Sequence, residues 1–178
     1  TTGFSGTNDS RYHLPLSISQ CDLPQQLSTN AGVLDRLLRP ENIVAGMSHT
    51  VNSGTMDASA LIKMALLLEP PARVILDVGA QVLDLQNQEM ASKWLSSVPE
   101  SEAQAVIFFD TRNEMCVLSR DGSVEPLEVS VYSKQMDSCL VYLDQAHTIG
   151  VDLKMPTNYR ALVTLGPSLT KDRLMQGK

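Results

Sequence analysis

The sequence predicts an α/β domain with a mostly parallel sheet, flanking helices and an exposed β-hairpin. Apolar runs of strand length alternate along the chain with segments of helical period. Strands that are apolar at every position are typical of parallel sheets, which are covered on both faces. With 178 residues, of which 43% are hydrophobic and 19% charged, the chain has a globular composition and the length of a domain with a buried core.

The N-terminal part of the chain is less regular than the rest. Residues 1–22 are rich in Gly, Ser, Thr and Asn, and we interpret them as a connector from a preceding lobe to a domain at 23–178. Residues 24–38 carry Leu and Ala at helical spacing between two prolines, whereas 41–55 lack periodicity and predict a loop. Because the chain begins without Met and closes inside an apolar-periodic segment near Thr170, we expect an internal piece of a larger protein, truncated in its C-terminal helix.

Four apolar strands and one hairpin are expected in the second half of the chain. The strands are expected at 73–78, 103–110, 139–143 and 160–165. The hairpin pairs 115–118 with 124–127 through Asp121 and Gly122, a pair that accepts the positive φ of a tight turn. We expect this hairpin to be exposed.

Two helices are expected among these strands. The first is expected at 58–68, between a loop and a pair of prolines. The second begins near Asn87, a favourable N-cap, and places Met90, Trp94 and Leu95 on one apolar face. These three side chains are expected to lie in the core.

Charge and cysteine content disfavour several functional classes. A net charge of −6 disfavours nucleic acid as a partner. The three cysteines form no CxxC pair, which favours free thiols in a reducing compartment and a cytoplasmic or nuclear location. No apolar run is long enough to span a membrane, and no Cys and His lie at metal-ligand spacing, so we expect no metal apart from Mg²⁺ brought by a nucleotide.

The loop after the expected strand 139–143 holds the strongest set of polar residues. In parallel sheets, ligands gather at the carboxyl ends of the strands. Four apolar residues followed by Asp144 and, three positions later, His147 resemble a Walker B strand of the DEAH type. In that motif the Asp holds Mg²⁺ and the next acid orients the attacking water. Here the next residue is Gln145, which cannot act as a carboxylate base.

A second interpretation assigns the same loop to the second RecA-like lobe of superfamily-two helicases and protein-translocase motor ATPases. Gly150 and Asp152 resemble the fifth conserved motif of that lobe, and residues 170–176 resemble the approach to the sixth. The turn at 3–7 resembles the Ser/Thr-Gly-Thr turn that closes the first lobe. The resemblance implies that these segments complete an ATP/Mg²⁺ site with an upstream domain, through Gly150, Asp152, Gln176, Gly6 and Thr7.

A narrower resemblance covers nearly the whole chain. The runs FSGTNDSRYHLPLSISQCDLPQQL, RVILDVGAQVLDL, CLVYLDQAH and GVDLKMPTNYRALVTLGPSLTKDRLMQ are similar to a segment of very large, mostly fungal multidomain proteins assigned as ubiquitinyl hydrolases. The resemblance implies a parent that acts in thiol-dependent deubiquitination, with ubiquitin or a ubiquitinated protein and the remainder of the parent chain as partners. Where that family usually has DEAH-T-R-G-T-D-L, this chain has Gln145, Ile149 and Val151, which implies a degenerate copy that is inactive in isolation.

Simpler interpretations of the same residues remain open. A thiol hydrolase needs a Cys whose thiolate is stabilised by a His, and Cys139 and His147 are candidates by residue type alone. Cys139 begins an apolar strand, however, which favours a core role. Asp144 would equally cap the following turn, and Gly150 would simply supply positive φ. The alternative function is therefore a non-catalytic scaffold that binds other proteins.

Overall fold

The structure, a computed structural model, describes residues 57–151 and 153–166 together with a few single residues and short stretches elsewhere. These others are 32, 35, 37–40, 42, 43, 169 and 174. The chain divides into two compact units, 1–54 and 55–178, and every element described below belongs to the second unit. Residues 32, 35 and 37 are helical, within the helix expected at 24–38, and Leu174 is helical within the expected C-terminal helix. The expected connector 1–22 lies outside the described residues, as does the expected loop 41–55 except for positions 42 and 43.

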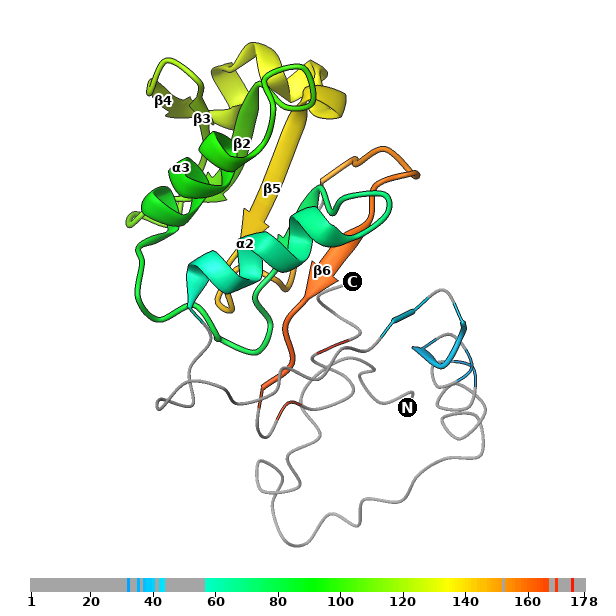
Figure 1. The fold of residues 1–178 in the computed structure, drawn as a ribbon. Coiled ribbons are helices and arrows are strands. Elements are labelled where there is room, and N and C mark those ends of the chain that lie inside the picture. The colour runs from blue at the N-terminus through cyan, green and yellow to red at the C-terminus, as the bar shows by residue number, and fades with distance from the viewer. Residues whose placement is uncertain are drawn as a thin grey trace, which may run out of the picture. The chain divides into compact units, whose positions relative to one another are not determined.

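Six strands form one mixed sheet in the order β4-β3-β2-β5-β1-β6 (Figure 1). The strands β1 (Val74–Leu76), β2 (Ala105–Phe109), β5 (Cys139–Leu143) and β6 (Ala161–Val163) run parallel. The prediction of an α/β fold with a mostly parallel sheet is confirmed. Each of the four expected strands is present, and three of them are shorter than expected: only β5 has the bounds that its apolar run predicts.

One face of the sheet is covered by the helices α2 (Ala58–Leu67) and α3 (Asn87–Ser97) (Figure 1). Trp94 is completely buried between α3 and the sheet, as its position in the apolar stripe predicts. The helix α3 begins one residue earlier than expected, and Gln86 is its N-cap residue. The Glu89 carboxylate accepts from the Gln86 backbone N–H at 2.9 Å, which leaves the side chain of Asn87 free for another role.

The opposite face is covered differently from the prediction. Its buried side chains, among them Val78, Ile107 and Val141, pack against Leu127, Tyr132 and Met136. Those partners belong to three short 3-10 helices, η1 (Leu127–Val129), η2 (Val131–Lys134) and η3 (Met136–Ser138). Within the described part of the chain, the α-helices therefore flank only one face of the sheet, and single turns cover the other.

The predicted hairpin is present as β3 (Met115–Ser119) and β4 (Val124–Pro126). Gly122 in its turn has φ +85°, as the Asp-Gly pair predicts. The expectation that the hairpin is exposed is wrong for β3, because β3 pairs with β2 along five residues and its central residues are buried. Only β4 and the turn are exposed, so the hairpin extends the sheet rather than projecting from it.

Candidate functional site

The carboxyl ends of three neighbouring parallel strands each carry an aspartate. Asp77 follows β1, Asp110 follows β2 and Asp144 follows β5. Parallel strands end at a common edge of the sheet, and ligands of α/β folds bind at that edge. The geometry of these carboxylates therefore defines the site that the sequence predicts.

Asp144 is held by hydrogen bonds from its own loop and from α3. Its Oδ1 accepts from the backbone N–H of His147 at 3.1 Å and contacts His147 Nδ1 at 2.5 Å. Its Oδ2 accepts from the Asn87 side-chain amide at 2.9 Å, and the same amide donates to the carbonyl of Phe109 at 2.9 Å. Asp144 thus caps the turn after β5, as the simpler interpretation expects, and it also joins that turn to α3 and β2.

The imidazole of His147 lies flat on the ring of Phe109. The ring centroids are 4.0 Å apart and the planes differ by 6°. Because Asp144 accepts at Nδ1, that nitrogen carries a proton. Nε2 lies 3.1 Å from Oδ1 of Asn113, in the turn between β2 and β3. An Asn amide can present either its oxygen or its nitrogen, so this contact suits both a neutral and a protonated imidazole.

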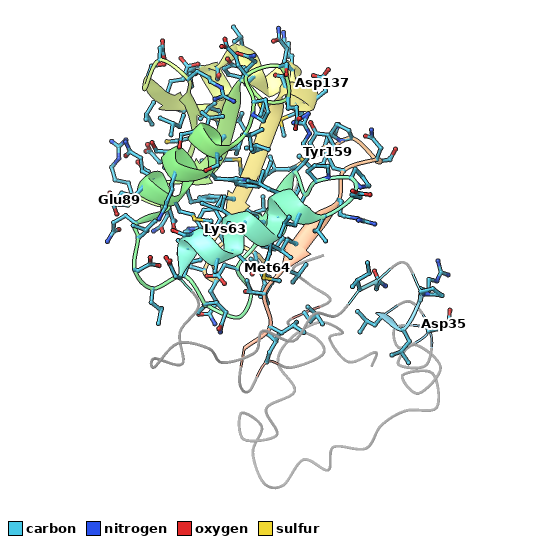
Figure 2. The ribbon with its side chains drawn as sticks, in the orientation of Figure 1. Asp35, Lys63, Met64, Glu89, Asp137 and Tyr159 are labelled. Carbon is cyan, nitrogen blue, oxygen red and sulfur yellow. The ribbon has the colours of Figure 1, made fainter. Side chains whose placement is uncertain are left out.

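A cleft of about 1090 Å³ opens beside this cluster. One wall is the N-terminal half of α3, where Figure 2 shows Glu89, and the other walls are the β2–β3 turn, β4 and the loop after β5. Asp144, His147 and Cys116 all line it. The cleft is slightly larger than most small-molecule sites, which range up to about 1000 Å³.

Most charges in the cleft are acidic or already paired. Arg112 contacts Asp110 at 3.1 Å and Glu114 at 3.0 Å, and these carboxylates raise the pKa of the Arg112 guanidinium. The backbone N–H groups of Glu114 and Arg112 lower the pKa of Asp110, with a smaller contribution from the Arg112 side chain. The N-terminus of α3 is likewise occupied by Glu89. Apart from Lys93, the described walls therefore offer little for a free phosphate group.

Among the described residues, no group of three or more His, Cys, Asp or Glu side chains is arranged to hold a metal ion. Asp144 could supply one oxygen to a cation, because Oδ2 accepts a single hydrogen bond. Any Mg²⁺ at this edge would need the rest of its ligands from a nucleotide, water or another domain.

Cys139 does not lie near His147. It begins β5, whereas His147 follows the end of β5, and the five residues of the strand separate the two ends by about 13 Å. Cys139 is completely buried, its thiol lies 3.6 Å from the carbonyl of Gln135, and burial raises its pKa to about 11. As a catalytic candidate it is wrong, and the core role is the one observed. Burial raises the pKa of Cys116 as well, so neither described thiol is activated.

Of the remaining residues of the predicted site, the structure describes only Gly150. Gly150 is exposed and has φ +79°, which agrees with the simpler interpretation. The predicted nucleotide contacts Asp152, Gln176, Gly6 and Thr7 lie outside the described residues.

Asp77 is a polar residue of this edge that the sequence interpretation missed. Its Oδ1 accepts from the Gln81 N–H at 2.8 Å and from the Thr164 hydroxyl at 2.5 Å, and its Oδ2 accepts from the Val82 N–H at 3.0 Å. Thr164 in turn accepts from the Gly79 N–H at 3.0 Å. The sequence did contain a pattern that could have identified Asp77, because this residue follows an apolar strand just as Asp144 does.

Asn87 and Asn113 were also missed as site residues, and the sequence carries no comparable signal for them. The amino edge of the sheet lies at the other end of β5, where Tyr159 donates to the carbonyl of Asp137 at 2.6 Å (Figure 2). Of the predicted site residues that the structure describes, only Cys139 lies at that edge.

Comparisons with protein-family models, with curated proteins and with solved structures find no match to this chain. Of the helices in the described part, none has the length and apolarity needed to cross a membrane.

Proposed function

We propose that this domain is a degenerate, helicase-like second lobe that completes an ATP/Mg²⁺ site with another domain of a larger protein of the ubiquitinyl-hydrolase type. One observation carries the proposal. Asp144 stands at the carboxyl end of a central parallel strand, fixed by Asn87 and His147, at the edge of a cleft of about 1090 Å³. This is the position where a Walker-type aspartate acts in α/β nucleotide-binding folds.

The side chains of the cleft determine which part of an ATP/Mg²⁺ site this lobe would supply. Asp144 would supply one oxygen near the metal, and Asn87 would keep that carboxylate in place. Gln145 cannot serve as a base, and the cations of the cleft are few. The phosphates would therefore be held by the other domain, and this lobe would respond to the nucleotide rather than hydrolyse it alone.

The test is ATP hydrolysis by the longer protein that contains this chain. We expect Asp144→Ala and Asp152→Ala each to lower the rate strongly. Asp121→Ala is the matched control, because Asp121 lies in the exposed β3–β4 turn and its carboxylate bonds only to Ser123 and its own turn. A longer protein without ATP hydrolysis, or one that is indifferent to both aspartates, would refute the motor role.

The second candidate is a non-catalytic scaffold that binds the remainder of the parent chain, ubiquitin or a ubiquitinated protein. It is favoured by the engagement of Asp144 in three hydrogen bonds and by the pairing of Arg112 with two carboxylates. Labelling of the longer protein with a ubiquitin-based thiol probe tests a third role, thiol-dependent hydrolysis by the parent. Because Cys116 and Cys139 are buried, we expect Cys139→Ser to leave any labelling unchanged, and a longer protein that is silent in both assays would support the scaffold.

A further inference from the structure

The β2–β3 turn forms one lip of the cleft and is internally rigid. Thr111, Arg112 and Asn113 line the cleft from this turn. The Asp110 Oδ1 accepts from the backbone N–H groups of Arg112 and Glu114, both at 2.9 Å. The Asn113 N–H donates to the carbonyl of Asp110 at 3.1 Å, and Asn113 has φ +61°. A turn held together in this way would move as a unit.

One side-chain contact joins this turn to the loop after β5 in the described part of the chain. It is the contact of 3.1 Å between Asn113 Oδ1 and His147 Nε2. His147 is fixed on its other side by Asp144, and its ring is supported by Phe109. Asp144, His147 and Asn113 therefore act in series, although Asp144 and Asn113 share no hydrogen bond.

We propose that His147 is a latch that couples Asp144 to the lip of the cleft. A ligand group or cation that binds Asp144 at Oδ2 and draws the carboxylate away from Nδ1 releases the imidazole, and the released imidazole no longer holds Asn113. The lip then opens, so occupation of the cleft regulates its own access. This inference concerns regulation of the site in the proposed function, and its test needs no nucleotide.

The test is cleavage of the 178-residue chain by trypsin after Arg112, whose side chain is 72% exposed. Trypsin cuts a folded turn in proportion to how often it opens. Asn113→Gly removes the side chain and keeps a residue that accepts positive φ, and we expect cleavage to rise about fivefold, the factor that one net hydrogen bond supplies. His147→Phe retains a ring to stack on Phe109 but loses the imidazole contacts with Asp144 and Asn113. We expect a similar rise in cleavage after Arg112. Cleavage after the exposed Lys134 serves as the reference site.

The decisive measurement is a double-mutant cycle between Asp144 and Asn113. If the latch operates, Asn113→Gly has no further effect on cleavage at Arg112 when Asp144→Ala is already present. Equal fold-changes in the two backgrounds would overturn the proposal. The fluorescence of Trp94, the single tryptophan of the chain, checks that each variant is folded. If Asp144→Ala does not fold, His147→Phe replaces it in the cycle, and a persisting effect of Asn113→Gly in that background overturns the latch equally.

Discussion

Asp77 and Asp144 follow neighbouring parallel strands, and the residues before them, Leu76 and Leu143, lie opposite one another in the sheet. Their surroundings differ. Asp77 is 2% exposed and its partners are two backbone N–H groups and a buried hydroxyl, whereas the Asp144 side chain is 27% exposed and two of its partners are side chains. The same residue type after the same kind of strand is thus a fixed structural element in one place and a rearrangeable one in the other.

The difference arises from what covers each strand end. At β1 and β6 the backbones of Gly79 and Gly166 approach so closely that a Cβ on Gly79 would lie 2.6 Å from the Gly166 nitrogen. The two backbones are therefore in direct contact at this strand end. Beside β5 and β2, α3 and the strand β4 leave the cleft open. We infer that the carboxyl ends of β1 and β6 are the fixed part of this edge of the sheet. The carboxyl ends of β5 and β2 have room to move relative to them.

The largest effect is expected from Asp77→Ala. It leaves two backbone N–H groups and the Thr164 hydroxyl without their acceptor in a buried site, at a cost of about 4 kcal/mol in the free energy of unfolding. Asp144→Ala should cost only about 1 to 2 kcal/mol, because water reaches the groups that it leaves. Urea unfolding followed by Trp94 fluorescence measures both. Equal losses in the free energy of unfolding would show that the strand ends at Asp77 and Asp144 do not differ in the way described.

A smaller effect is expected from Gly79→Ala. Its Cβ would meet backbone atoms at 2.6 Å, and the overpacking should cost about 2 to 3 kcal/mol. Gly150→Ala is the control at the other end. No atom lies within 4 Å of its Cβ position, so only the positive φ of 79° adds a cost, about 1 kcal/mol. Thermal unfolding of both variants gives the comparison, and a Gly79→Ala protein as stable as Gly150→Ala would contradict the close packing at β1–β6.

The sequence predicts those parts of the fold that depend on local pattern. The strand expected at 139–143 has those bounds in the structure, because every one of its five side chains is buried and the whole run is apolar. The helix expected at 58–68 and the hairpin are confirmed for the same kind of reason. The covering of the second face was not predictable, because η1, η2 and η3 are single turns without a hydrophobic period.

The candidate site also has a part that local sequence predicts and a part that it does not. Asp144 and His147 are three positions apart, so one short pattern contains both. Asn87 is 57 positions from Asp144 and Asn113 is 34 positions from His147, and only the order of strands brings them together. The expected N-cap role of Asn87 failed because Gln86 is the N-cap residue, and the Asn87 amide bonds to Asp144 instead. Local sequence therefore identifies the pair Asp144 and His147 but not the residues that hold it.

The smallest effect is expected from Asp110→Asn, in the turn that forms the lip of the cleft. Backbone N–H groups lower the pKa of Asp110 in the folded protein, so the unfolded chain binds more protons as the pH falls. The stability that the carboxylate contributes is therefore fully present above about pH 4, its unfolded value, and is lost as the pH falls through the folded value. The effect is small because this group lies at the surface, where water and salt screen its charge. Urea unfolding at pH 7, 4 and 3 should show Asp110→Asn less stable than the wild type at pH 7, with a difference that shrinks as the pH is lowered from 4 to 3.

Thr111→Val is the matched control for that pH dependence, because it changes the neighbouring residue of the same turn without changing a titrating group. Its difference from the wild type should be constant over the same range. A constant difference for Asp110→Asn as well would mean that the carboxylate does not hold the turn through its charge. The rigidity of the lip would then depend on the hydrogen bond between Asn113 and the Asp110 carbonyl, and the latch at His147 would act on a looser turn than the bonds to Asp110 imply.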